Sequence, residues 1–365
     1  MKALSWAGFV AGLLLFLATS HSVIVTLIIP RSQVSPLSRS VSTAIRKAFL
    51  FFGRRRRDYL ARDPLLAWVA PVSLLGLLAV WIFLYVVAYA LIMWPLVPDG
   101  IGQALRESGS SVFTLGFASE PAAAPTIVMM CAASTGLVIV ALQIAYLPTL
   151  YASFNRRETA VTLLQTRAGS PAWGPEILRR HLAVQTLDAL GPLYQRWEEW
   201  AADVLESHTT YPALVYFRSP DPLSSWVLGL LAVLDSAAMY LALAPERAPA
   251  EARLVLRMGY VTLNSVAASL RLPHAVDPDP DDPIELSLEE FTAGCGRIFD
   301  AGFPAERSLH DAWAHFRGWR VNYETAAYAL SDATMAAPGP WSGTRTHLPD
   351  LMIIPRAPAD RRPRT

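Results

Sequence analysis

The chain has 365 residues, of which 53% are hydrophobic, an apolar composition for a protein of this length. Its 31 basic and 30 acidic residues nearly cancel, so the net charge gives no argument for nucleic acid as a partner. The two cysteines, Cys131 and Cys295, provide neither a disulfide framework nor a CxxC metal pair.

An apolar stretch over residues 4–30 is the first predicted element, and it is long enough to cross a bilayer core of about 30 Å. Lys2 before it and the small residues at 18–20 also resemble a signal peptide. The next residues, 31–63, carry nine basic side chains, and a loop with this charge stays in the cytoplasm. We therefore predict an uncleaved anchor, residues 1–30, with its N-terminus outside, followed by a basic cytoplasmic loop.

Within this loop, residues 40–59 are predicted to form an amphipathic helix. Its apolar side is formed by Val41, Ala44, Ile45, Ala48, Phe51 and Phe52. Such a helix lies on the inner leaflet and binds acidic lipid headgroups. A topology anchor without a regulatory role accounts for the same pattern.

Two further apolar stretches, residues 65–97 and 125–151, are also long enough to cross the membrane. The loop between them carries three acidic residues and one basic residue, Arg106, and is therefore predicted to be external. The last stretch is followed by Arg156 and Arg157. All these charges agree with one orientation, in which the C-terminal half is cytoplasmic and the chain lies in the inner or plasma membrane.

A short helix is predicted between these two stretches, over residues 101–113. At 1.5 Å per residue it is about 20 Å long, too short to span the bilayer. In this setting the residues that follow it resemble the pore loop of potassium channels, whose filter reads TVGYG or TIGFG. The filter positions are taken by Thr114, Leu115, Gly116, Phe117 and Ala118, and Ala118 departs from the family by replacing the second glycine.

The resemblance covers about residues 65–153 and implies a pore domain, residues 64–154, with an outer helix, a re-entrant pore helix, a filter loop and an inner helix. It implies a homotetramer, because one chain supplies a quarter of the filter, and K⁺ in the filter as the transported ion. Backbone carbonyls of four loops would replace the water shell of the ion. Gly136 and Pro148 would form a gating hinge in the inner helix. Gln143 would line the cavity or bond across a helix bundle.

Ala118 keeps a second interpretation open. A β-carbon at a filter position that needs a positive φ costs about 1 kcal/mol or more in each subunit. The alternative is a non-conducting, membrane-anchored sensor or scaffold with a degenerate pore loop. The chain has no GxSxG, Walker A, GxGxxG or HExxH pattern, so neither an enzyme nor a cofactor or metal site is predicted.

The C-terminal half, residues 155–337, is predicted to be an all-α cytoplasmic domain that binds an unknown ligand or protein. Its apolar and polar periodicity, interrupted by prolines, predicts helices over 156–168, 175–207, 224–244, 250–271, 286–300 and 308–334. Residues 338–365 are predicted to be a disordered tail. The fold class is thus an all-α membrane protein with three transmembrane helices, a re-entrant pore helix and an all-α cytoplasmic domain.

Residues 224–243 are apolar enough to be a fourth membrane segment. Asp235 lies near the centre of this segment, and an unpaired aspartate there costs about 2.5–3.5 kcal/mol on insertion. We therefore predict a buried core helix. The acidic run at 277–282 lacks the spacing of a calcium-binding EF-hand loop and is predicted to be solvated.

Overall fold

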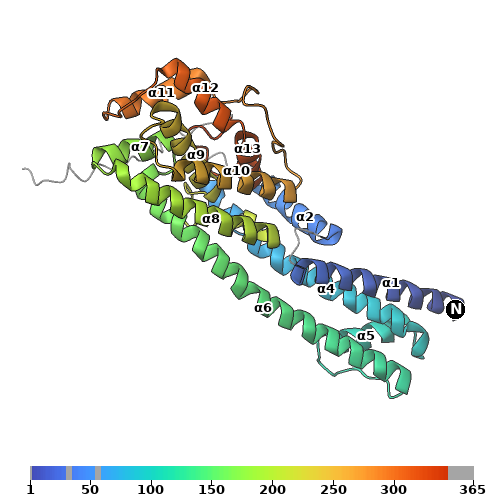
Figure 1. Ribbon diagram of the computed structural model, residues 1–365. Coiled ribbons are helices and arrows are strands. Elements are labelled where there is room, and N and C mark those ends of the chain that lie inside the picture. Colours follow the sequence, from blue (N-terminus) through green and yellow to red (C-terminus); the bar gives the residue numbers. More distant parts are fainter. Residues whose placement is uncertain (1, 30–34, 54–58, 344–365) are drawn as a thin grey trace, which may run out of the picture. The chain divides into compact units, whose positions relative to one another are not determined.

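The computed structural model describes residues 2–29, 35–53 and 59–343, and these residues form helices and loops without a strand (Figure 1). The chain divides into two compact units. The first unit contains Met1–Arg57 and Leu65–Ala152, and the second contains Asp58–Pro64 and Ser153–Thr365. Part of the predicted basic loop, residues 54–58, and most of the predicted tail, residues 344–365, lie outside the described residues.

The described residues of the first unit form five main helices. Their apolar faces are covered by one another or by lipid. They are α1 (Lys2–Leu27), α2 (Pro36–Gly53), α4 (Val69–Met93), α5 (Ile101–Val112) and the first part of α6 (Ala123–Ala168). A short 3₁₀ turn, η1 (Trp94–Leu96), ends α4.

The packing of α1 along α4 depends on a glycine. A β-carbon at Gly12 would lie 2.7 Å from the Ala88 carbonyl oxygen, so only glycine permits this approach. Trp81 of α4 donates a hydrogen bond to the Ser22 hydroxyl of α1 at 3.1 Å. Small residues and side-chain hydrogen bonds of this kind are how membrane helices associate.

Among the described residues, four helical stretches are long and apolar enough to cross a membrane, namely Lys2–Leu27, Tyr59–Leu96, Ala123–Ala168 and Trp226–Leu243. The first three overlap the three predicted membrane stretches, 4–30, 65–97 and 125–151, and expose many of their apolar side chains. Exposed apolar surface over helices of this length is typical of a protein that lies in lipid. The chain is therefore a membrane protein with transmembrane helices.

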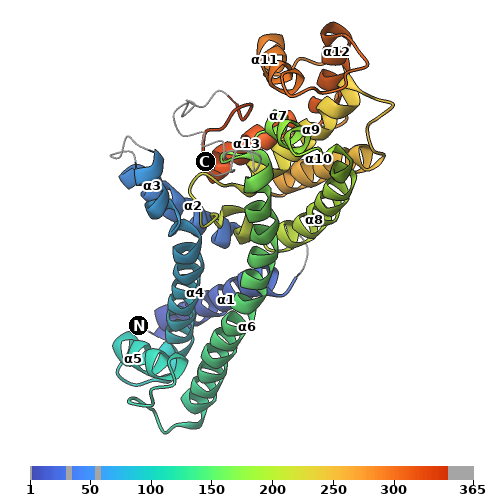
Figure 2. The ribbon, with the colours of Figure 1, turned by 90° about the vertical axis from the view of Figure 1, so that its left-hand side faces the viewer.

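The third of these stretches, α6, is one helix of 46 residues, drawn in green in Figure 2. The prediction of two helices, 125–151 and 156–168, was wrong at their junction. That boundary was inferred from the change to charged residues near Asn155, but a change in composition does not end a helix. Arginine and glutamate are good helix formers, and no glycine or proline stands between Thr149 and Ala168.

The second unit is built around α9 (Trp226–Leu243), every residue of which is buried. Around it lie the short α3 (Tyr59–Leu66) and the helices α7 (Gly174–Ala183), α8 (Leu190–Thr210), α10 (Glu251–Ser269), α11 (Leu288–Phe299), α12 (Leu309–Arg320) and α13 (Glu324–Thr334), together with two 3₁₀ turns, η2 (Leu187–Ala189) and η3 (Pro212–Tyr216). The prediction that residues 224–243 form a core helix is confirmed, since the helix is fully enclosed.

Two predicted helices were too long. Residues 175–207 form α7 and α8, separated by a turn in which Gln185 has a φ of 55°. Residues 308–334 form α12 and α13, separated by a tight turn at residues 321–323. Gly191 and Pro192 at the start of α8 mark the first break, and the predicted helix ran through them although proline suits the first turn of a new helix. The turn at 321–323 contains no glycine or proline, so the sequence lacked that signal there.

A buried ion cluster explains how α9 tolerates Asp235. Arg320 of α12 is fully buried and donates to Asp235 at 2.6 Å and to Glu324 at 2.7 Å. Tyr323 donates a second hydrogen bond to Asp235 at 2.9 Å. Burial alone would lower the pKa of Arg320, but the negative charges of Asp235 and Glu324 hold that pKa well above its usual value. Burial raises the pKa of Asp235 to about 6, because Arg320 and Tyr323 offset only part of the cost of burial. A guanidinium thus lies between two acidic side chains within an apolar core.

The segment after α13 is packed rather than free. Trp341, placed by the sequence analysis in the disordered tail, is buried and lies edge-on against Trp173, with ring centroids 5.7 Å apart. Its carbonyl oxygen accepts a hydrogen bond from Arg320 at 2.8 Å. The prediction of disorder was therefore wrong for residues 338–343, because a tryptophan provides enough apolar surface to dock the segment. Residues 344–365 lie outside the described part of the chain.

Candidate functional site

The candidate site is the short helix α5 with the turn that follows it. The helix begins after Gly100, whose φ of 77° suits glycine, and ends after 12 residues. It buries a face that includes polar side chains: Ser108 is fully buried and donates to the Val86 carbonyl of α4 at 2.7 Å. The observed bounds, Ile101–Val112, agree closely with the predicted helix over 101–113.

A carboxylate network lies along α5. Gln103 donates to Glu107 at 2.7 Å and to Glu120 at 3.0 Å, and it accepts a hydrogen bond from the Asp99 backbone at 2.9 Å. Glu107 is buried, and its Oε2 atom has no hydrogen-bond partner among the described residues. Two acidic side chains are therefore held together by one amide group, which ties the residues after the turn back to the helix.

The turn after α5 closes on the helix. The Leu115 amide donates to the Ser110 carbonyl at 2.8 Å, and the Thr114 amide donates to the Ser111 carbonyl at 2.8 Å. This pair of bonds defines a Schellman motif with Thr114 at the left-handed position, where its φ is 55°. The Ala118 amide donates to the Ser110 hydroxyl at 3.1 Å. Sequence reasoning missed Ser110, since a serine within a helix carries no signal for such a contact.

The predicted filter residues lie together on the surface of the single chain. Leu115 and Phe117 are 65% and 62% exposed, and Thr114 and Gly116 are exposed as well. Gly116 has a φ of 70°, a conformation that favours glycine, whereas Ala118 is not among the described residues with positive φ. Backbone strain in this conformation therefore falls on Thr114, a β-branched residue, and not on Ala118.

The three residues predicted in the inner helix have different surroundings. A β-carbon at Gly136 would lie 1.9 Å from the Val112 carbonyl oxygen, so this glycine lets the end of α5 touch α6. Gln143 is buried, on the same stripe as Gly136 and Ile139. Pro148 is exposed, and the helix continues through it. The hinge and cavity roles of these residues stay predictions.

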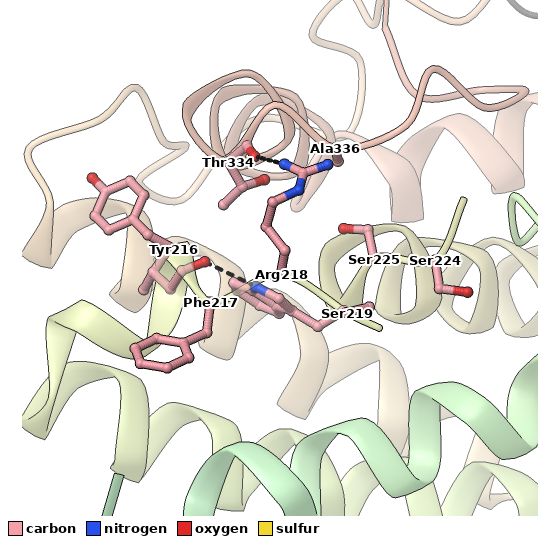
Figure 3. A pocket seen from close by; sticks show the side chains of 10 residues that line it. Tyr216, Phe217, Arg218, Ser219, Ser224, Ser225, Thr334 and Ala336 are labelled. Atoms are coloured by element: carbon pink, nitrogen blue, oxygen red, sulfur yellow. Dashed lines mark hydrogen bonds between the residues drawn. The ribbon is translucent and has the colours of Figure 1, made fainter. Parts of the chain in front are cut away.

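A second site is a small pocket in the second unit (Figure 3). Figure 3 shows Arg218 extending toward Thr334 with Ser219, Ser224 and Ser225 close by. The cavity holds about 20 Å³, which is room for about one water molecule. A pocket of this size excludes a metabolite, so the interest of the site lies in Arg218 itself.

Beside this pocket lies a buried cluster centred on Arg157. Arg157 is fully buried, and it donates to Glu158 at 2.8 Å and to the carbonyl oxygens of Leu214 and Phe217 at 2.8 and 2.7 Å. It also lies 3.0 Å from Nε2 of His208. Because Arg157 can only donate, Nε2 must be the acceptor and the His208 proton sits on Nδ1. Burial and the positive charge of Arg157 hold the pKa of His208 well below its usual value.

This arrangement predicts an acid-sensitive second unit. Folded His208 stays neutral, whereas the unfolded chain takes up a proton below pH of about 6.5, so stability is lost as the pH falls through that value. We expect His208→Gln to reduce the pH dependence of the unfolding free energy by up to about 1.4 kcal/mol per pH unit between pH 6.5 and 5. Urea unfolding followed by tryptophan fluorescence measures the slope, since Trp226 lies 5.1 Å from the His208 ring.

The exposed His315 provides the control for this experiment. Substitution of His315 by glutamine should leave the slope unchanged. Burial also lowers the pKa of His181. Its effect on the pH dependence is the same in the wild type, His208→Gln and His315→Gln, so it does not alter the comparison. Equal slopes for the wild type and His208→Gln would contradict the assignment of a neutral, buried His208.

The described residues contain no group of three or more histidine, cysteine, aspartate or glutamate side chains that could hold a metal ion. In the acidic run at 277–282, Asp279 and Asp282 accept hydrogen bonds from backbone amides of the same loop. Asp281 pairs with Arg317. No protein-family model, curated protein or solved structure matches the chain.

Proposed function

We propose that the chain is one subunit of a homotetrameric, potassium-channel-like pore that conducts K⁺ passively. The observation that carries this proposal is α5 with its turn: a helix too short to span a membrane, placed between two that are long enough. Non-helical backbone at membrane depth is tolerated only where protein buries it or where it lines a water-filled path. An axial pore shared by four copies meets that requirement.

The exposure of the filter residues supports assembly around an axis. Thr114, Leu115, Gly116 and Phe117 have no cover in the single chain. Two large apolar side chains exposed beside a glycine are unfavourable unless other copies or lipid contact them. The C-terminal end of α5 points its partial negative charge toward these residues, which favours a cation nearby.

In the proposed orientation the N-terminus lies outside and the second unit lies in the cytoplasm, where it would gate the pore. Helix α2 would then lie on the inner leaflet. Its exposed Phe51 and Phe52 suit the apolar layer, and Arg39, Arg46 and Lys47 suit acidic headgroups.

The test is Rb⁺ flux into liposomes that contain the purified full-length protein. We expect flux above that of empty liposomes, and a loss of flux in Gly116→Asp, because a side chain at a φ of 70° would disturb the filter backbone and block its axis. Gly109→Ala, at a position of α5 where an added β-carbon meets nothing within 4 Å, is the matched control and should conduct. Equal flux in the wild type and Gly116→Asp would contradict the proposal.

One observation favours the second candidate, a non-conducting sensor or scaffold. The turn after α5 satisfies its own hydrogen bonds through Ser110 and Ser111, as the end of an ordinary helix does. If this turn persists in the assembled protein, the Thr114 and Leu115 carbonyls do not form an extended ladder of ion ligands. Absence of flux in the wild type with flux restored by Ala118→Gly would support this candidate.

A further inference from the structure

Most of helix α3 belongs to the second unit, although the chain passes into the first unit before the helix ends. Residues Asp58–Pro64 are part of the second unit, whereas Leu65–Ala152 belong to the first. Only residues 67 and 68 separate the end of α3 at Leu66 from the start of α4 at Val69. Because so few residues lie between the two helices, a displacement of α3 also moves the start of α4.

Arg218 holds α3 in the second unit. Its Nε donates to Asp63 Oδ1 at 2.6 Å, and its Nη2 donates to the Tyr59 hydroxyl at 2.5 Å. The side chains of Arg218 and Asp63 are only 10% and 8% exposed. An ion pair so well shielded from water is a strong restraint, because loss of either charge leaves the other one buried without an opposite charge.

The same guanidinium is fixed on its other side by the end of α13. Nη1 of Arg218 donates to the carbonyl oxygens of Thr334 and Met335 at 2.8 and 3.1 Å, and Figure 3 shows the bond to Thr334. Free carbonyls at a helix C-terminus carry partial negative charge and favour a cation. Tyr59 adds a bond of its own, from its hydroxyl to the Pro222 carbonyl at 3.1 Å.

The geometry assigns Arg218 as a positioning residue: it fastens α3 to the second unit and so makes α3 a link through which that unit positions the outer helix α4. This inference rests on the proposed function for its effect on conduction, but the link itself does not depend on conduction. The continuous helix α6 is a further covalent connection, which enters the second unit after Ala152. The second unit would thus act on both membrane helices of the pore, not on the inner helix alone.

Hydrogen exchange of the full-length protein in liposomes tests the link. In Arg218→Gln, the amides of residues 59–66 should exchange at least about tenfold faster, since several hydrogen bonds to a charged group are lost. The amides of residues 69–76 at the start of α4 should also exchange faster. Asp63→Asn should have the same effect in both segments. Arg247→Gln, which breaks the exposed pair with Glu306 in the same unit, is the control and should change neither segment.

Rb⁺ flux through the same proteins tests what the link does. If the wild type conducts, we expect Arg218→Gln to change the flux per folded protein about fivefold or more, the usual scale of coupling between sites. The inference is overturned if hydrogen exchange at 59–66 is unchanged in Arg218→Gln. It is also overturned if exchange becomes faster at 59–66 but not at 69–76. Unchanged flux in a conducting protein overturns it as well. A wild type without flux refutes the proposed function alone, and the exchange at residues 69–76 then decides the inference.

Discussion

Replacement of Arg320 by leucine should destabilise the second unit by about 3–5 kcal/mol, the cost of breaking a buried ion pair by removing one partner. Arg320 is the only described partner of the Asp235 carboxylate that carries a positive charge. Without it, Asp235 and Glu324 stay in the core with an uncompensated charge, and the Tyr328 hydroxyl and Trp341 carbonyl each lose a bond. Since a domain is stable by only about 5–15 kcal/mol, much of the unfolding free energy would be lost.

Urea unfolding followed by tryptophan fluorescence measures this loss. Arg317→Leu is the matched control, because it removes an arginine from the same helix, three positions away. Arg317 pairs with Asp281, which is 89% exposed, and such pairs contribute about 0–1 kcal/mol. If both variants unfold at the same urea concentration, the Arg320 cluster does not stabilise the core as inferred.

Substitution of Gly136 by alanine should disrupt the packing of α5 against α6. The new β-carbon would lie 1.9 Å from the oxygen and 2.9 Å from the carbon of the Val112 carbonyl, and backbone cannot move aside as a side chain can. Overpacking of this kind costs about 1–3 kcal/mol or more. We expect a lower unfolding temperature in detergent and faster hydrogen exchange over α5.

Gly109→Ala separates this effect from the general effect of alanine in a helix. Gly109 lies in α5 with open space around it, so alanine should be neutral or stabilise the helix by up to about 1 kcal/mol. The comparison also addresses the predicted hinge. If Gly136 serves mainly as a hinge, Gly136→Ala should alter Rb⁺ flux while its unfolding temperature matches that of Gly109→Ala.

Apolar length and helix-breaking residues predicted the elements that lie in or near the membrane. The stretch at 101–113 was recognisable because it lies between two stretches of membrane length and Thr114-Leu115-Gly116 follows it, and α5 has nearly these bounds. The same rules failed near Asn155, because charged residues continue a helix as readily as apolar ones. They also failed at Gln185, which turns the chain without being a glycine.

The contacts that decide the stability and the candidate sites could not be read from local sequence. Asp235 was recognised as costly, but its partner Arg320 stands 85 positions later, and nothing in the pattern of either segment joins them. Arg218 and Asp63 are separated by 155 positions. Close approach of Gly136 to Val112 depends on how two helices cross, which a single helix pattern does not contain.

During synthesis, α9 leaves the ribosome 85 residues ahead of Arg320. At about 5–20 residues per second, Asp235 is without its arginine for about 4–17 s. In that interval α9 is a segment long and apolar enough to enter a membrane. The unpaired carboxylate then opposes insertion by about 2.5–3.5 kcal/mol. The aspartate that later joins the ion cluster thus first helps to keep the newly made segment out of the bilayer.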